Sequence, residues 1–131
     1  MTIYPLTALV TLLFCVLMLG TGINVGRARG LYGIKAPAMS GHQMFERAHR
    51  IQMNTLENAA IALPAMWVNA VFVSDRGAAA LGAAWVVARI WYAVAYQRDP
   101  AKRSVPYGAS LAAFAFMWVA AAWGIVRLNW L

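Results

Sequence analysis

Four long apolar stretches alternate with short polar segments along the chain. They predict helices at about residues 4–25, 44–73, 77–97 and 105–126. At ~1.5 Å rise per residue, helices of this length cross a bilayer core of ~30 Å. Backbone groups in lipid must be paired within the segment, which favours helices over other structures. The pattern therefore predicts an all-α integral membrane protein, with residues 1–131 forming a single four-helix transmembrane domain.

The connections contain residues that begin helices. In SDRG, residues 74–77, Ser74 or Asp75 is expected to be the N-cap of the third helix. In RDPAKRS, residues 98–104, Ser104 is expected to cap the fourth helix, with Pro106 tolerated in its first turn. The segment GRARGLYGIKAPAMSGHQ is expected to be the loop between the first two helices. The N-terminus has no basic region, so the first apolar stretch predicts a retained helix and not a signal peptide.

Composition agrees with a membrane protein. Hydrophobic residues make up 63% of the chain and charged residues 11%, whereas soluble domains are about half apolar and a quarter charged. The net charge is +7, and most bases lie in the first and third connections and at the polar start of the second helix. Only Arg76 and Arg127 lie on the opposite side. This distribution indicates cytoplasmic loops near anionic headgroups, with both termini non-cytoplasmic, and argues against nucleic-acid binding.

Polar residues enter two of the predicted helices at helical spacing. On the second helix they are spaced three, four and three residues apart, so they share one face. They are Arg47, Arg50, Asn54 and Glu57. The polar residues of the third helix share one face too, provided that the helix persists to residue 103. They are Arg89, Tyr92, Tyr96, Asp99 and Arg103.

Energy excludes lipid as the environment of these faces, because a charge near mid-bilayer costs at least ~2.5–3.5 kcal/mol. One interpretation is a structural ion pair between Glu57 and Arg89 or Arg50. The other is a cationic cavity at the cytoplasmic side that binds a polar anionic ligand beside an apolar one. Arginine forks bind carboxylates, Asn54 can donate and accept, and Glu57 can hold an ammonium group. A transporter is a third possibility, but there is no internal repeat to support it.

Two motifs resemble a known family. FERAHRIQMNTLEN at 45–58 and ARIWYAVAYQRDPAKRS at 88–104 are similar to the MAPEG family, the membrane-associated proteins in eicosanoid and glutathione metabolism. That family includes microsomal glutathione transferases and microsomal prostaglandin E synthase. The four-helix layout matches over essentially the whole chain. The resemblance implies a homotrimer surrounded by membrane lipids, with glutathione bound between neighbouring subunits at the cytoplasmic side.

The resemblance also implies a glutathione-dependent enzyme that conjugates, reduces or isomerises a lipophilic electrophile. Arg103 is expected to stabilise the glutathione thiolate, assisted by the hydroxyl of Ser104. The residues expected to contact the tripeptide are Arg29, Arg50, Gln52, Asn54, Glu57, Tyr92 and Tyr96.

Some features depart from the family pattern and leave an alternative open. Arg29 is followed by Gly30, where some members have a second arginine, and some prostaglandin synthase members have histidine where Tyr92 stands. The resemblance therefore assigns no particular electrophile. The family also contains a non-enzymatic member, so a module that binds a lipid or a partner protein is the alternative. No metal site is expected, because His42 and His49 have no Cys or carboxylate partners at ligand spacing.

Overall fold

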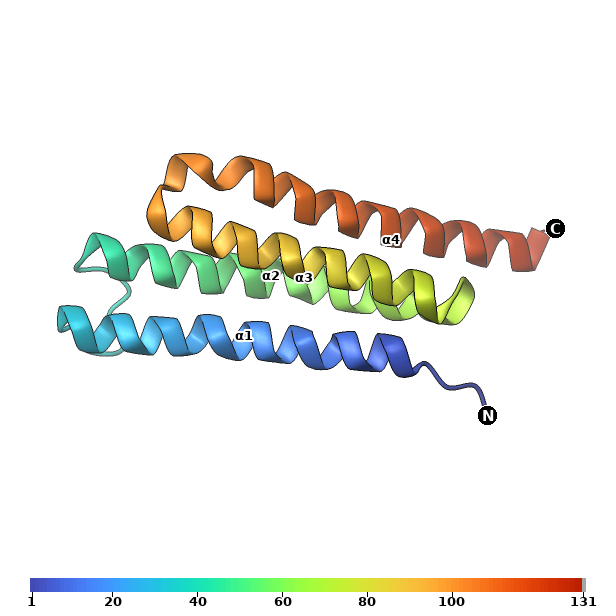
Figure 1. The fold of residues 1–131 in the computed structure, drawn as a ribbon, viewed down its shortest axis with the longest axis horizontal. Helices are drawn as coiled ribbons and strands as arrows, with labels where there is room; N and C mark the ends of the chain where they lie inside the picture. Colours follow the sequence, from blue (N-terminus) through green and yellow to red (C-terminus); the bar gives the residue numbers. More distant parts are fainter. Residues whose placement is uncertain (131) are drawn as a thin grey trace.

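The computed structural model describes residues 1–130, which form four long helices joined by short connections. The helices are α1 (Pro5–Tyr32), α2 (Gln43–Phe72), α3 (Asp75–Arg98) and α4 (Ser104–Trp130), with a 3₁₀ turn, η1 (Pro100–Arg103), before α4. They run antiparallel, and both chain ends lie at the same end of the bundle (Figure 1). The central pair, α2 and α3, pack against each other, and α1 and α4 each pack against both of them. The predicted four-helix bundle is confirmed.

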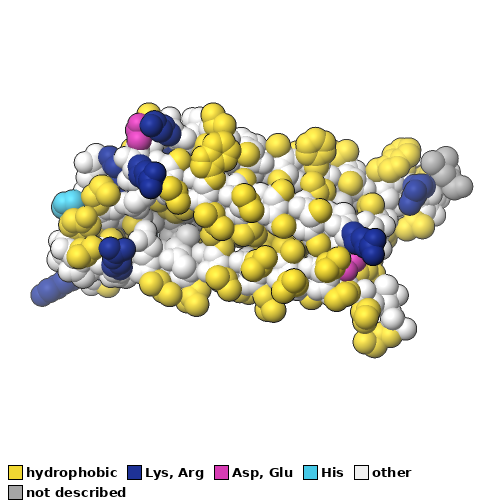
Figure 2. Space-filling model, in the orientation of Figure 1, with side chains coloured by type: hydrophobic (Ala, Val, Ile, Leu, Met, Phe, Trp, Pro, Cys, Tyr) yellow, Lys and Arg dark blue, Asp and Glu magenta, His cyan; other side chains and the backbone are white. Residues whose placement is uncertain are grey.

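Three segments are long and apolar enough to cross a membrane by length and composition: α1, α3, and residues Pro100–Trp130. The remaining helix, α2, has 30 residues and is long enough. It is not among the three apolar segments, because its polar face lowers its mean hydropathy. Figure 2 shows apolar side chains along the middle of the bundle, with Lys and Arg gathered toward its two ends. This distribution is typical of a chain that places its middle in lipid and its ends at the headgroups.

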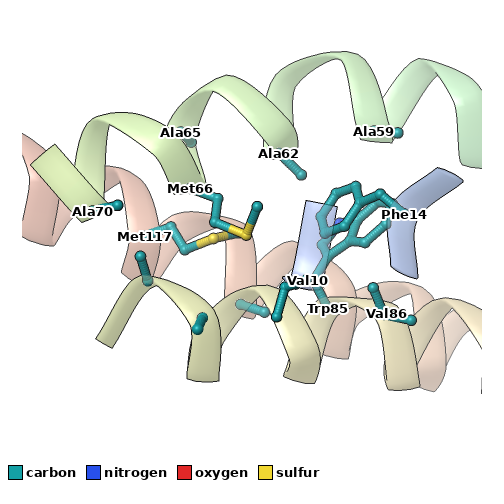
Figure 3. Close-up of a cluster of buried hydrophobic side chains, with 13 residues drawn as sticks. Val10, Phe14, Ala59, Ala62, Ala65, Met66, Ala70, Trp85, Val86 and Met117 are labelled. Carbon is teal, nitrogen blue, oxygen red and sulfur yellow. The ribbon is translucent and has the colours of Figure 1, made fainter. Parts of the chain in front are cut away.

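The main core lies where α1, α2, α3 and α4 meet in the half of the bundle away from the α1–α2 connection. The rings of Phe14 and Trp85 stack with centroids 4.5 Å apart, and Met66 and Met117 are fully buried. In Figure 3 the two methionine side chains point toward one another, beside alanines of α2. Small residues at these positions let the helices approach closely, which is how packing stabilises helices in lipid.

Helix α1 continues beyond its expected end at residue 25, so the prediction of a loop from Gly26 was wrong. Val25 and Ala28 are buried against Phe45 and Ala48 of α2, and this packing outweighs the cost of glycines in the last turns. The helix ends at Gly33, whose φ of 66° is left-handed, a conformation that glycine adopts without strain.

Helix α3 begins and ends for identifiable reasons. The Ser74 hydroxyl accepts a hydrogen bond from the Gly77 amide at 3.0 Å, which confirms Ser74 as the N-cap. The helix ends at Arg98, close to the expected residue 97, so the condition that it persist to residue 103 is not met. Asp99 is extended, with φ −153° and ψ 107°, because proline at 100 disfavours helical angles in the preceding residue. Ser104 has helical angles, φ −64° and ψ −42°, so it begins α4 without being the expected N-cap.

Candidate functional site

A cavity of about 460 Å³ opens between α2, α3 and the start of α4. It lies toward the end of the bundle where α1 ends and α2 begins. Nine residues line it: Arg50, Met53, Asn54, Glu57, Tyr92, Tyr96, Arg103, Ser104 and Tyr107. Seven of the nine sequence-predicted site residues are among them. Parts of the two polar faces inferred from helical spacing thus meet in one cavity, whereas Arg47, Arg89 and Asp99 of the same faces do not line it.

Helix α2 supplies one wall through a single face. Arg50, Asn54 and Glu57 project from successive turns, as their spacing of four and three residues requires. Met53 lies between them on the same face, and the sequence reasoning missed it. The spacing could have identified it, because Met53 is three residues after Arg50 and four residues before Glu57 and therefore shares their helix face.

The tyrosines form the opposite wall. The rings of Tyr92 and Tyr96, one turn apart on α3, have centroids 5.7 Å apart, and the ring of Tyr107 lies 6.2 Å from that of Tyr92. Tyr107 was also missed, although it follows Arg103 by one helical turn. The rings are tilted, by 53° between Tyr92 and Tyr96 and by 51° between Tyr92 and Tyr107, and they line the cavity with aromatic surface and hydroxyl groups.

The turn η1 brings the proposed catalytic pair to this wall. The Arg103 guanidinium carbon lies 5.4 Å from the centroid of the Tyr96 ring, within the range of a cation–π contact. The side chain of Asp99 accepts a hydrogen bond from the Ala101 amide at 3.0 Å and stabilises the turn. The chain thus reaches the cavity through a proline-initiated 3₁₀ turn, and α3 itself stops at Arg98.

The ion pair considered for Glu57, with Arg89 or with Arg50, is not present among the described residues. Arg89 Nη2 donates instead to Oδ1 of Asn54 and to Oγ1 of Thr55, both at 2.8 Å. Glu57 is exposed at the edge of the cavity. Its carboxylate is therefore positioned to meet a ligand.

Arg47 lies outside the cavity, although it belongs to the same predicted stripe. Its Nη1 donates to the backbone oxygen of Gln97 at 3.1 Å and to that of Arg98 at 3.4 Å. These are carbonyls of the last turn of α3, which have no partner within the helix. Arg47 therefore caps the C-terminal end of α3, where a cation also complements the helix dipole.

Two expected ligand contacts lie away from the cavity within one chain. Arg29 Nη1 donates to the Ala38 carbonyl at 2.8 Å, and its guanidinium carbon lies 4.8 Å from the centroid of the Phe45 ring. The Gln52 amide nitrogen lies against α1, 3.1 Å from where a Cβ on Gly22 would be. Neither residue lines the cavity, so a single subunit does not bring them together with the other seven.

No group of three or more His, Cys, Asp or Glu residues within 1–130 is arranged to hold a metal ion. His42 instead begins α2: its Nδ1 accepts a hydrogen bond from the Met44 amide at 3.1 Å. Its ring stacks on Tyr32 at a centroid distance of 3.8 Å. These contacts give His42 a structural task at the junction of α1 and α2.

Comparison with known proteins places the chain in a family. The model of the MAPEG family matches residues 7–123. Leukotriene C4 synthase of Bos taurus is 32% identical over 121 residues, covering 92% of this chain and 81% of the relative. Microsomal glutathione S-transferase 2 of Homo sapiens is 30% identical over 105 residues, covering 80% and 71%. An uncharacterized protein of Synechocystis sp. is 46% identical over 102 residues, covering 78% and 72%. The chain belongs to the MAPEG family and is an integral membrane protein.

Proposed function

We propose that the protein is a glutathione-dependent membrane enzyme that conjugates, reduces or isomerises a lipophilic electrophile. The observation on which this rests is the single cavity that joins Arg50, Asn54 and Glu57 to Tyr92, Tyr96, Arg103 and Ser104. One relative is by name a glutathione S-transferase, which supports the same reading. A volume of about 460 Å³ lies within the range of ~300–1,000 Å³ that small-molecule sites occupy.

The charges of the cavity complement those of glutathione. The tripeptide has two carboxylates, one ammonium group and one thiol. The cavity offers the guanidinium groups of Arg50 and Arg103 and the carboxylate of Glu57. Arginine binds carboxylates through paired hydrogen bonds, which suits Arg50 to a carboxylate of the tripeptide, and the Glu57 carboxylate suits the ammonium group. Asn54, Tyr92 and Tyr96 supply the remaining polar contacts.

Arg103 has the catalytic role in this proposal. A cysteine thiol has a pKa of about 8.5, and only its thiolate is a good nucleophile. A guanidinium beside the sulfur lowers the pKa of the bound thiol, and each tenfold gain in the thiolate-to-thiol ratio corresponds to about 1.4 kcal/mol. The thiol proton passes to solvent at the open side of the cavity, and the Ser104 hydroxyl donates a hydrogen bond to the sulfur. The protein contributes proximity and charge stabilisation to the attack.

A lipophilic substrate has an apolar route along the same pair of helices. A second cavity, of about 430 Å³, lies between α2 and α4 deeper in the bundle. Its lining consists of apolar residues, among them Ile61 and Val68 of α2 and Phe114 and Trp118 of α4. An electrophile dissolved in the bilayer would enter along this groove and meet the thiolate at its polar end.

The assembly proposed is a homotrimer with glutathione between subunits. Arg29 and Gln52 lie away from the cavity of their own chain, so they reach glutathione only from a neighbouring subunit. The orientation proposed places the cavity at the cytoplasmic side. Both termini and Arg76 lie at the opposite end of the bundle from the more basic α1–α2 and α3–α4 connections, which supports it through the positive-inside rule.

The test measures thiolate formation directly. Purified protein in detergent is mixed with glutathione, and the ultraviolet band of the thiolate is recorded. We expect Arg103→Ala to abolish the band at neutral pH while the melting temperature is kept, because the side chain is exposed. Lys102→Ala is the matched control, since it removes the neighbouring cation, which lies outside the cavity. An unchanged band in Arg103→Ala would exclude the catalytic role.

Turnover separates the enzyme from the non-enzymatic alternative. The protein with glutathione is offered a chloronitrobenzene, a lipid hydroperoxide and an endoperoxide, which represent conjugation, reduction and isomerisation. Turnover of any one identifies the reaction class. No turnover with all three, together with no glutathione binding by calorimetry, would indicate a lipid- or protein-binding module.

A further inference from the structure

Arg89 is a fully buried charge whose partners are all neutral. It is 0% exposed, and it donates to Asn54 Oδ1 and Thr55 Oγ1, both at 2.8 Å, and to Ser110 Oγ at 3.4 Å. No carboxylate pairs with it in the part of the chain that the structure describes. Burying a guanidinium without a counter-charge costs free energy of folding. A function of Arg89 would account for a charge kept at this position despite that cost.

The guanidinium lies directly behind the wall of the cavity. Its carbon is 4.1 Å from the centroid of the Tyr92 ring and 6.0 Å from that of Tyr107. Both tyrosines line the cavity, whereas Arg89 does not. Cation–π contacts at these distances offset part of the desolvation cost and fix the rings in place. Arg89 is thus in contact with three lining residues, counting Asn54, without lining the cavity itself.

The contact with Asn54 determines which way its amide points. Arginine has only donors, so the atom of Asn54 that faces Arg89 must be the oxygen. The Asn58 amide nitrogen also donates to this oxygen, at 3.4 Å. Both hydrogen bonds that residues 1–130 give to the Asn54 side chain therefore end on Oδ1. The NH₂ group donates to no acceptor among residues 1–130, and Asn54 lines the cavity, so this group is free to meet a ligand.

We propose that Arg89 is a positioning residue: by holding Oδ1 of Asn54, it commits the Asn54 amide to present N–H donors to an acceptor oxygen of the bound tripeptide. This inference rests on the proposed function and deepens it. An asparagine without such a partner can rotate its amide and offer either group. With Arg89 in place, the cavity selects a carboxylate or carbonyl oxygen at this point and disfavours a ligand that offers a donor there.

The first test keeps the contact with Arg89 and removes the donor. Asn54→Asp retains an acceptor for Arg89 and turns the contact into a buried ion pair, so the melting temperature should be kept or raised. The carboxylate has no N–H to offer the ligand. Calorimetry should therefore show the Kd for glutathione rising about tenfold or more, the range for losing a hydrogen bond to a charged or carbonyl group. A Kd within about twofold of the native value would overturn the proposal.

The second test asks whether Arg89 acts through Asn54. Arg89→Gln should raise the Kd about tenfold in the native chain and by no more than about twofold in the Asn54→Ala background, because the residues act as one unit. The control is Thr55→Val, which removes the other acceptor at 2.8 Å from a residue outside the cavity. It should lower the melting temperature and leave the Kd within about twofold.

The outcomes separate the two proposals. If the native protein binds no glutathione, the proposed function and this inference fall together. If the native protein binds but Arg89→Gln is equally harmful in both backgrounds, or if Thr55→Val weakens binding as much as Arg89→Gln does, Arg89 has only a structural role. Should Arg89→Gln fail to fold, Asn54→Asp keeps the proposal falsifiable, because a Kd within about twofold of the native value in that variant would still overturn it.

Discussion

Five arginines of this chain have different partners and therefore different roles. Arg47 binds the last carbonyls of α3, and Arg29 binds the connection between α1 and α2. Arg89 is buried against neutral acceptors. Only Arg50 and Arg103 present their charge to the cavity. The role of each arginine follows from which acceptors its element places within reach.

The charge of Glu57 should contribute to glutathione binding. Glu57→Gln keeps the size of the side chain and removes its charge, so the attraction to the glutathione ammonium group is lost. We expect the Kd measured by calorimetry to rise about tenfold, in line with the strength of charged hydrogen bonds. The melting temperature should change little, because Glu57 is exposed in the subunit and such substitutions cost within about 0.5 kcal/mol.

The matched control for this prediction is Glu46→Gln, at an exposed position on the same helix outside the cavity. It should leave the Kd as it is and lower the melting temperature slightly, because Glu46 lies in the first turn of α2 and its charge complements the helix dipole. Native affinity in Glu57→Gln together with a lowered melting temperature would instead indicate a structural ion pair formed in the assembled protein.

At the scale of elements, the contact between α2 and α4 depends on one glycine. A Cβ on Gly124 would lie 2.6 Å from the Phe72 backbone oxygen, closer than real atoms approach. The end of α2 can thus approach α4 closely because Gly124 has no side chain, and small residues commonly allow such contacts where helices pack in membranes. The same region contains Asn69, whose side-chain nitrogen donates to the Met117 carbonyl at 3.1 Å.

Gly124→Ala should destabilise the protein by about 1–3 kcal/mol, the usual cost of forcing extra volume into a packed contact. The measurement is thermal unfolding in detergent. Gly20→Ala is the control, because a Cβ on Gly20 meets nothing within 4 Å and alanine is the better helix former by about 1 kcal/mol. Equal melting temperatures in the two variants would show that α4 can move away from α2 at no cost.

At the scale of the whole molecule, the predicted site residues lie on two different sides of the subunit. Seven line the cavity between α2, α3 and α4, whereas Gln52 packs beside α1 and Arg29 lies on it. In the proposed trimer, one complete site takes the cavity from one subunit and Arg29 and Gln52 from the next. Neither side of a subunit then forms a complete glutathione site without the opposite side of a neighbouring subunit.

Mixed assemblies test this division. A chain with Arg103→Ala has a damaged cavity, and a chain with Arg29→Ala and Gln52→Ala has a damaged opposite side. Each should bind glutathione poorly alone. Co-expressed, they should regain part of the native binding, because the cavity of the second chain then meets the intact side of the first. No gain in the mixture over the separate variants would place Arg29 and Gln52 outside the site.

The residue order is enough to predict the membrane class, the four helices and most of the residues that line the cavity. Apolar length sets where the chain crosses lipid, and spacings of three and four residues group Arg50, Asn54 and Glu57 on one face whatever the tertiary structure. The start of α3 was likewise predicted at Ser74 or Asp75, and a local hydrogen bond to the Ser74 hydroxyl makes Ser74 the N-cap. These features depend on interactions between residues that are close in the chain, so they can be predicted from the sequence.

Which charged side chains meet depends on how the helices pack against one another. Arg47 and Arg89 belong to the predicted polar faces, yet one caps α3 and the other is buried behind the cavity. Arg103 reaches the cavity through a 3₁₀ turn, and α1 extends to Tyr32 because Val25 and Ala28 pack on α2. Such outcomes depend on partners that are distant in sequence, and the free energy of those contacts outweighs local preference.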